Sequence, residues 1–268
     1  MLRFGYDAES HVGLVRDGNE DAGFAGPYLQ LVADGVGGAA AGEVASATTA
    51  YVVSALAAME SRGDLLEMLR DATRTAHEQL RVGVELDGSR AGMATTLTAI
   101  VTDGDRCALV HVGDSRAYLL RGGELHRLTA DHTFVQSLVE QGRLSPEEVR
   151  RHPYRSVVLR SVDAETPPEP DAVYLDLRVG DRLLLCSDGL TDLVSDAVIT
   201  SAMTGLDRDE AVSVLVRAAL EAGGRDNVTC LLADVEDGPR LVRTGKVLGA
   251  MADPYLVVDP AAVRLSTA

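Results

Sequence analysis

The sequence is poor in cysteine and has no cysteine pattern of a metal or redox site. Its three cysteines are Cys107, Cys186 and Cys230. They form no C-x-x-C pair, and an odd number does not suit a disulfide framework. Each lies within an apolar run, so we predict three buried, unreactive thiols.

Signals for secretion and for membrane insertion are also missing. The first residues, MLRFGYDAES, contain no apolar segment of the kind that a secretory signal needs. No run approaches the ~18 apolar residues of a membrane-spanning helix. We therefore expect a cytoplasmic protein that does not associate with a membrane.

Positive charge is scarce. The chain has 25 Lys and Arg against 41 Asp and Glu, which gives a net charge of −16. Such a chain repels nucleic acids and anionic lipid, so we expect no nucleic-acid partner. The 268 residues, 46% of them hydrophobic, suffice for one large domain or two small ones with a real core.

Hydrophobic periodicity predicts paired helices with hairpin-linked strands between them. Helices are expected at 40–59, 64–86 and 208–222, with a further helix start at Ser145-Pro146. Strands are expected at 29–33, 95–101, 107–112, 117–120, 182–186 and 228–235, and a loop at 164–171. This order favours antiparallel sheets covered by helices over a doubly wound parallel sheet. Residues 237–268 lack a clear period and are assigned to a C-terminal tail of unknown role.

Acidic residues follow or precede several of these apolar strands. Asp34-Gly35, Gly113-Asp114 and Asp188-Gly189 each end a strand, and Asp226-Asn227 precedes the last one. Any one of these pairs alone is most simply a turn, because Asp and Gly favour turn conformations. Together, their carboxylates can converge on one edge of the sheets. Carboxylates at such short distances repel one another, so they must bind protons or share cations.

The residue types indicate which cation would fit. Oxygen ligands favour Mg²⁺ or Mn²⁺ over Zn²⁺, and the six histidines form no zinc pattern. Two such ions about 3.5–4 Å apart would form a hydrolytic centre that activates water. Arg16, four residues before Glu20, offers a guanidinium that matches a phosphate. On its own, Arg16 would be read as a solvated loop cation.

These residues resemble, in order along the chain, the metal-dependent protein phosphatase family, the type 2C Ser/Thr phosphatases, in its compact bacterial form. The matching segments are Arg16-Asp17-Gly18-Asn19-Glu20-Asp21, Val32-Ala33-Asp34-Gly35-Val36-Gly37-Gly38, Ala94-Thr95-Thr96-Leu97, Val112-Gly113-Asp114-Ser115-Arg116, Ser187-Asp188-Gly189-Leu190 and Asp226-Asn227-Val228-Thr229. Each motif is weak alone, but six in family order over most of the chain are a strong signal.

The resemblance implies an α+β fold, a four-layer αββα sandwich of two antiparallel sheets with a metal cleft at one edge. Residues 1–236 would form the catalytic domain, and 131–160 a flap beside the cleft. It also implies a role for each matching residue. Asp34 would bridge two Mn²⁺ or Mg²⁺ ions. Further ligands would be the Gly35 carbonyl, Asp188 and Asp226, while Glu20 and Asp21 would act through water. Asp114 would belong to a third, weaker metal site, and Arg16 would bind the phosphate.

Three departures from the family pattern concern the cleft and the flap. Val36 stands where some relatives carry a histidine that is a candidate general acid, although bacterial relatives also lack it. Ala94 stands where Gly is frequent, and Val162-Asp163 where Leu-Gly is usual. No expected metal ligand is missing.

Other catalytic readings fit less well. A cysteine phosphatase needs C-x₅-R, and no arginine lies six residues after any cysteine. Ser115 lies in a near match to G-x-S-x-G, but the following residues alternate as a strand, whereas that motif needs a strand-to-helix turn. The glycines around Val36 lack the lysine of a phosphate-binding loop.

We therefore predict a Ser/Thr phosphoprotein phosphatase in which metal-activated water attacks phosphorus in line. The expected partners are phosphorylated proteins, including Ser/Thr kinases or their targets, in signal transduction, and we expect a monomer. One alternative is a catalytically silent phosphatase-like module that binds a phosphoprotein. Another is a phosphatase of small phosphoesters, which would use the same metal centre.

Overall fold

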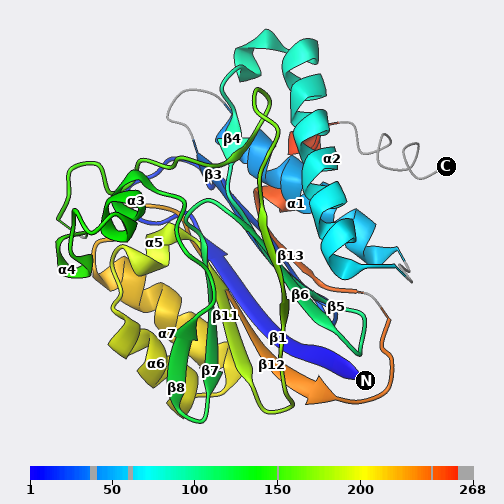
Figure 1. Cartoon of the computed structure of the whole chain (residues 1–268), viewed down its shortest axis with the longest axis vertical. Coiled ribbons are helices and arrows are strands. Elements are labelled where there is room, and N and C mark those ends of the chain that lie inside the picture. The colour runs from blue at the N-terminus through cyan, green and yellow to red at the C-terminus, as the bar shows by residue number, and fades with distance from the viewer. Residues whose placement is uncertain (37–40, 60–62, 150, 243, 259–268) are drawn as a thin grey trace.

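Two antiparallel β-sheets lie face to face at the centre of the molecule in the computed structural model (Figure 1). The structure describes residues 1–36, 41–59, 63–149, 151–242 and 244–258. The first sheet has the strand order β1-β12-β11-β7-β8. Its strands are β1 (Leu2–His11), β12 (Val228–Asp237), β11 (Arg182–Cys186), β7 (Arg116–Arg121) and β8 (Glu124–Arg127).

The second sheet follows the order β10-β6-β5-β3-β2-β13, with two short strands attached to it. Its main strands are β10 (Asp171–Leu175), β6 (Cys107–Val112), β5 (Leu97–Thr102), β3 (Leu29–Val36), β2 (Asp21–Ala25) and β13 (Lys246–Gly249). The short strands are β4 (Ala94–Thr95), which pairs with β3, and β9 (Val162–Asp163), which pairs with β4.

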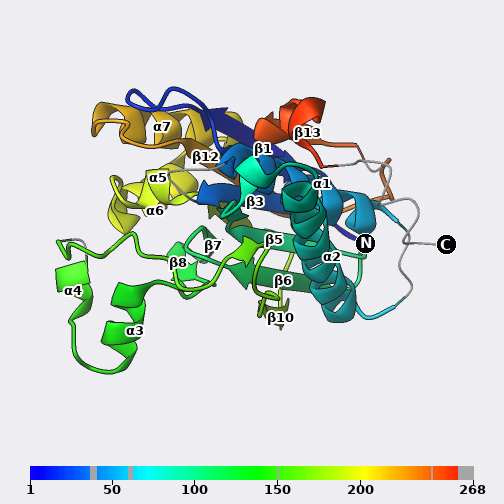
Figure 2. The same ribbon diagram turned by 90° about the horizontal axis from the view of Figure 1, so that it is seen from above.

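Helices cover the outer face of each sheet, which gives four layers (Figure 2). The second sheet is covered by α1 (Gly42–Ala58) and α2 (Leu65–Leu86), and a short 3₁₀ turn, η1 (Gly88–Arg90), follows. The first sheet is covered by α5 (Asp188–Thr191), α6 (Asp196–Gly205) and α7 (Arg208–Glu221). The start of α2 is fixed by Asp64, whose carboxylate accepts the backbone N–H groups of Leu66 and Glu67.

Three apolar clusters fill the spaces between the layers. One lies between the two sheets, and the other two lie between a sheet and its helices. Every residue of β5 and β6 is buried, because these central strands have a packed layer on both faces. This arrangement confirms the predicted α+β, four-layer αββα sandwich.

A segment of two short helices projects from one end of the sandwich (Figure 1). It contains α3 (Phe134–Glu140) and α4 (Pro146–Val149), and lies within the predicted flap, residues 131–160. Its two ends meet at a bridge between Thr133 and Val158.

Several local expectations differ from the structure. The predicted strand 29–33 continues to Val36, and the predicted strand 95–101 is divided at Thr96. β10 begins at Asp171, inside the expected loop, and α6 was not foreseen. Residue 40 of the first expected helix and Gly37-Gly38 of the expected motif lie outside the described residues.

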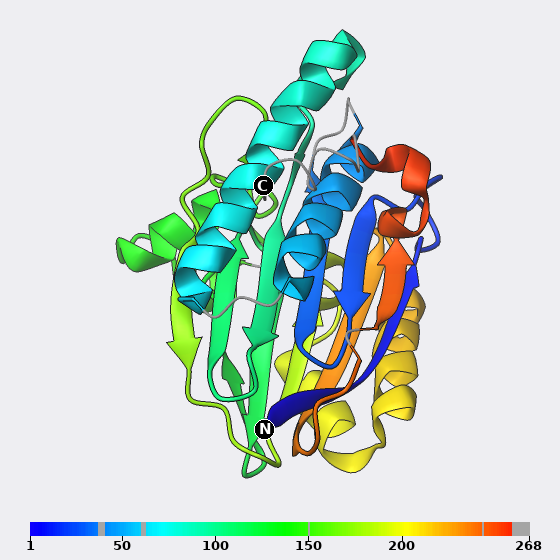
Figure 3. The same ribbon diagram turned by 90° about the vertical axis from the view of Figure 1, so that its right-hand side faces the viewer.

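The chain beyond Asp237 returns to the sandwich. β13 pairs with β2 at the edge of the second sheet, and is drawn in orange-red in Figure 3. The 3₁₀ turns η2 (Ala250–Ala252) and η3 (Pro254–Leu256) follow and pack against α1. Val258 is buried against Gly83 of α2. The part of the predicted tail that the structure describes here therefore contributes to the core. No described helix is long and apolar enough to cross a membrane.

Candidate metal centre

The predicted acidic residues meet at a cleft of about 510 Å³ at the end of the sandwich that bears the flap. Sequence-predicted groups that line it are Arg16, Glu20, Asp34, Gly35, Asp114, Asp188 and Asp226. Strand ends from both sheets supply them, so the cleft lies across the seam between the sheets.

Local structure explains why these carboxylates meet. Asp21 and Asp34 face each other across the antiparallel pair β2 and β3 of the second sheet. Asp188 follows β11, and Asp226 precedes β12, so both lie at the same end of the first sheet. Asp114 follows β6, at the point where the chain leaves the second sheet for β7 of the first.

Burial and mutual repulsion make the cluster hard to ionise completely. Burial raises the pKa of Asp34 well above its ordinary value, and the charges of Asp21 and Asp188 raise it further. The pKa of Asp188 is likewise raised well above the ordinary range, by burial and then by the charge of Asp114. Burial, assisted by the charge of Asp131, raises the pKa of Asp114 to about 7. A bound cation would relieve this repulsion.

Asp21 differs from the other acids because it lies behind the wall of the cleft and is fully buried. Ser187 donates a hydrogen bond of 2.7 Å to its Oδ2. Its Oδ1 has no hydrogen-bond partner. Burial raises the pKa of Asp21 to about 6, and the Ser187 hydrogen bond offsets part of that rise. An unpaired buried carboxylate oxygen next to a cluster of acids is a place where a water or an ion would be expected.

The donor set fits hard divalent cations. Carboxylates and the Gly35 carbonyl supply only oxygen, which Mg²⁺ and Mn²⁺ prefer. Within the described parts of the chain, no three acidic, histidine or cysteine side chains already form a group that could hold an ion. The carboxylates that face the cleft would therefore turn toward an ion as it binds.

Arg16 reaches into the cleft and is oriented by one of these acids. Its Nη2 lies 2.9 Å from Asp226 Oδ2. This hydrogen bond is the main cause that raises the pKa of Arg16. A guanidinium has five N–H donors, so one bond to Asp226 leaves others for a ligand.

Asn227 fixes the loop that carries Arg16 and Glu20. The Asn227 side chain is buried, and its Nδ2 donates to the carbonyls of Val12 and Gly18, both at 2.9 Å. Its Oδ1 accepts the backbone N–H of Glu20 at 2.8 Å. The Asp226-Asn227 pair thus supplies a carboxylate to the cleft and also holds the opposite loop in place.

The structure excludes the competing nucleophiles. Ser115 is fully buried, its Oγ lies 2.6 Å from Thr96 Oγ1, and the strand β7 follows it instead of a helix. Cys107, Cys186 and Cys230 are all buried, and burial raises the pKa of each thiol. This confirms the prediction of three buried thiols.

Four further polar residues line the cleft and were not predicted as site residues: Asp192, Arg155, Ser156 and Arg225. Asp192 lies four residues after Asp188, which is one helical turn, and its charge raises the pKa of both Asp188 and Asp114. Helical spacing after Asp188-Gly189 could have identified it. Arg155 belongs to the flap, and its Nε lies 3.5 Å from Asp192 Oδ2; no short motif marks it.

The base of the flap is held by a cluster of polar contacts. His132 Nε2 lies 3.1 Å from Asp171 Oδ2, and Arg160 Nη1 lies 3.2 Å from Asp171 Oδ1. The Nδ1 atom of His132 accepts the backbone N–H of Gly113 at 3.1 Å. Both ends of the flap are therefore tied to the first residue of β10, and the His132 end is also tied to the turn that carries Asp114.

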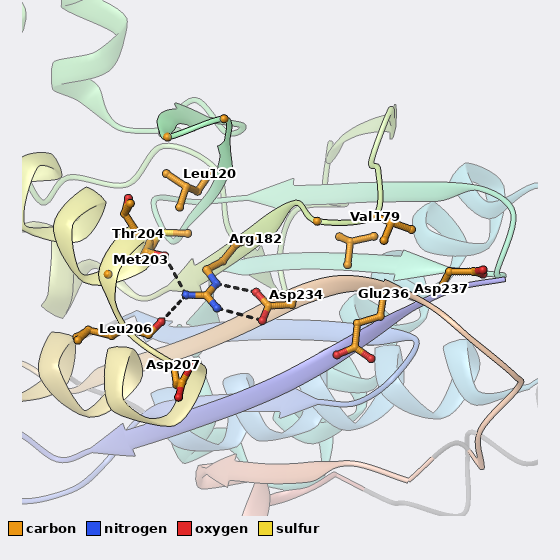
Figure 4. Close-up of a pocket in the computed structure, with 15 residues that line it drawn as sticks. Leu120, Val179, Arg182, Met203, Thr204, Leu206, Asp207, Asp234, Glu236 and Asp237 are labelled. Carbon is orange, nitrogen blue, oxygen red and sulfur yellow. Dashed lines mark hydrogen bonds and ion pairs between the residues drawn. The ribbon is translucent and has the colours of Figure 1, made fainter.

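A second, larger pocket of about 850 Å³ lies at the opposite end of the first sheet (Figure 4). β12 begins beside the metal cleft and ends at this pocket, so about 30 Å separates the two. The Arg182 guanidinium there is occupied by Asp234 and by the carbonyls of Met203 and Leu206. The predicted acidic residues and Arg16 line the metal cleft and not this pocket.

Comparison with known proteins is consistent with this geometry. Residues 18–232 match the profile of the family described as Protein phosphatase 2C. The serine/threonine protein phosphatase PstP of Mycobacterium tuberculosis is 48% identical over 232 residues, which is 87% of this chain and 45% of the relative. The protein phosphatase PhpP of Streptococcus pneumoniae is 34% identical over 235 residues, 84% of this chain and 95% of the relative. This chain thus spans about half the length of its mycobacterial relative.

The structural comparison agrees with the sequence comparison. The crystal structure of the catalytic domain of PstP in complex with two manganese ions superimposes with a TM-score of 0.82. The two chains are 46% identical, and the match covers 88% of this chain and 100% of the other.

Proposed function

The chain belongs to the protein phosphatase 2C family, and on that basis we propose that it is a metal-dependent phosphatase of phosphoserine and phosphothreonine in proteins. The observation that supports this most directly is the convergence at one cleft of Arg16 with acids from both sheets. The PstP structure that contains two manganese ions supports the choice of cation.

Each residue has a role in this proposal. Asp34 would contact both of two Mn²⁺ or Mg²⁺ ions, with Asp188, Asp226 and the Gly35 carbonyl as further ligands. Glu20 and Asp21 would act through bound water, and Asp114 would belong to a third, weaker site. When bound, the ions would supply an activated water and neutralise charge on the phosphate.

The protein groups position the substrate for in-line attack. Arg16 binds phosphate oxygens with the N–H groups that Asp226 does not use. The hydrogen bonds of Asn227 hold the loop of Arg16 and Glu20, so the guanidinium is already in place when substrate enters. The flap covers one side of the cleft with Arg155, Ser156 and Val158.

The proposal extends to partners. The substrates would be phosphorylated proteins, including Ser/Thr kinases or their targets. We propose that the protein acts as a cytoplasmic monomer in signal transduction.

Hydrolysis of p-nitrophenyl phosphate and of a phosphothreonine peptide, in Mn²⁺ and in EDTA, tests the proposed activity. We expect turnover that requires metal and is lost in Asp188→Ala. The matched control is Asp105→Ala, an exposed acid in the turn between β5 and β6.

The alternatives make different predictions in the same assay. A folded protein that binds the phosphopeptide without turnover would be the silent binding module. A protein that hydrolyses p-nitrophenyl phosphate but not the peptide would be a phosphatase of small phosphoesters.

A further inference from the structure

One arginine of the cleft pairs with no acid among the residues that the structure describes. Three arginines line it: Arg16, Arg155 and Arg225. Arg16 is paired with Asp226, and Arg155 with Asp192. Among the described residues, Arg225 has neither a hydrogen-bond partner nor an ion-pair partner, and its side chain is exposed.

Arg225 lies on a rim of the cleft, which we define as residues 13–16 and 223–226. The backbone N–H of Leu14 donates to the carbonyl of Gly224 at 2.7 Å, which joins the two segments. Gly13 has a φ of +84°, a conformation that favours glycine. This hydrogen bond joins the segment of Arg225 to residues 13 and 14, and Arg225 lines the cleft beside them.

The rim also has apolar surface next to its cations. Leu14 and Val15 are 65% and 66% exposed. Arginine is enriched in surfaces that contact other proteins, and the neighbouring apolar side chains give a bound peptide a surface to pack against. The rim includes Arg16, which the proposed function assigns to the phosphate.

An exposed arginine is ordinarily just solvated, so the surroundings of Arg225 decide its role. The protein has a net charge of −16, and acids line the cleft. An acidic peptide would be repelled from such a surface unless a cation met it. Arg16 and Arg155 are already paired, so Arg225 is the guanidinium available for a second anion.

We propose that Arg225 recognises a second negative charge, a carboxylate or a second phosphate, close to the phosphorylated residue of the substrate. This inference rests on the proposed phosphatase function and narrows its substrates to acidic or multiply phosphorylated segments. Arg225 is then a specificity-determining residue, and the reacting phosphate remains with Arg16.

A set of phosphothreonine peptides tests this inference. Each peptide has one Asp or one phosphoserine at a position from three residues before to three residues after the phosphothreonine, in an alanine background. The readout is the ratio of kcat/KM for each acidic peptide to that for the neutral peptide. At one or two neighbouring positions we expect a ratio of about 3 to 10 in the wild type.

Variants of Arg225 then identify the cause of the preference. The ratio should fall to about one in Arg225→Gln, and Arg225→Glu should favour an additional peptide with lysine at the same position. The control is Arg217→Gln, an exposed arginine of α7 that pairs with Glu221, which should keep the wild-type ratio. A ratio unchanged in Arg225→Gln, or no preference in the wild type, would overturn the inference.

A binding measurement separates this inference from the phosphatase activity itself. Fluorescence anisotropy of the same peptides with wild type and Arg225→Gln reports recognition without turnover. Metal-dependent turnover without an Arg225-dependent preference would reject the inference alone. Preferential binding without any turnover would reject the proposed activity and keep the acidic recognition.

Discussion

At the level of single residues, the cleft concentrates negative charge that the fold does not neutralise. Asp34 and Asp188 both have pKa values raised well above the ordinary range, by burial and then by the charges of neighbouring acids. A protein gains no stability from such an arrangement, because like charges repel in a low-dielectric site. The arrangement is instead suited to binding cations.

Replacing Asp34 should therefore separate activity from stability. We expect Asp34→Asn to lower kcat in Mn²⁺ by about 100-fold or more, because a shared metal ligand is lost. The same change should raise the free energy of unfolding in EDTA by about 1 kcal/mol, because one repelling charge is removed. Steady-state kinetics and urea unfolding measure the two effects, with Asp105→Asn as control. Near-normal turnover would show that Asp34 is not a ligand.

Arg16 should affect substrate binding more than the chemical step. In Arg16→Ala we expect KM for p-nitrophenyl phosphate to rise about tenfold, because a charge-assisted contact to phosphate is lost. Arg16→Lys should recover only part of this, because lysine lacks the planar fork that matches phosphate. If KM stays unchanged in both variants, Arg16 is a solvated loop residue that pairs with Asp226 and does not bind phosphate.

At the level of secondary-structure elements, the flap depends on contacts at its base. His132 and Arg160, near its two ends, both contact the Asp171 carboxylate. The Arg160 pair is half exposed, so its contribution to stability is small, but it joins two segments far apart in the chain. Local opening of the flap should respond to its loss more than global stability does.

Limited trypsin digestion tests this role of Asp171. We expect cleavage after Arg151 or Arg155 to become about threefold faster in Asp171→Ala, while the thermal unfolding midpoint changes little. The control is Asp176→Ala, which removes an exposed pair with Arg178 in the next loop. Equal cleavage rates in the two variants would mean that the bridge between Thr133 and Val158 holds the flap without Asp171.

Hydrophobic periodicity predicted most elements but not the places where strand partners change. The expected strand 95–101 is divided because Thr96 leaves the ladder: its N–H donates to the Asp34 carbonyl, and its Oγ1 accepts the Asp34 N–H. β10 lies at a sheet edge and is half exposed, so it lacks the apolar run that would reveal it. Sequence patterns report burial, whereas these features depend on tertiary contacts.

The candidate site was more predictable than the details of the fold. Each carboxylate of the cleft except Asp192 adjoins a strand or a motif in a recognisable order. Its residue type and position in the sequence were therefore sufficient to predict it as a site residue. Arg155 and Arg225 could not be predicted, because an isolated arginine in a loop has no local signature. Only the packing of the flap and of the rim places these two side chains at the cleft.

At the level of the whole molecule, stability should depend on pH and on metal together. The folded pKa values of Asp21 and Asp114 are about 6 and about 7, above their ordinary value of 3.8. Between pH 3.8 and about pH 7 the folded protein binds more protons than the unfolded chain, so its stability falls as the pH rises. Without metal, we expect the thermal unfolding midpoint to fall as the pH is raised from about 4.5 to about 7.5.

Added Mn²⁺ should reverse this trend. Ions compete with protons for the same carboxylates, and binding to the folded state alone raises its stability. The difference between the midpoints in Mn²⁺ and in EDTA should therefore widen from pH 5 to pH 8. Thermal unfolding at constant ionic strength measures it. A midpoint in EDTA that rises over this range would contradict the assignment of these carboxylates.

The position of the cleft across the seam of the two sheets has a mechanical consequence. Asp34 belongs to one sheet, Asp188 and Asp226 adjoin the other, and the hydrogen bond from Ser187 to Asp21 links the same two edges. An ion held there would act as a clamp at one end of the sandwich, while the apolar layer holds the rest. Loss of the ion would then let the two sheets move apart at the cleft end first. The packing at the far end of β11 and β12 would be unchanged.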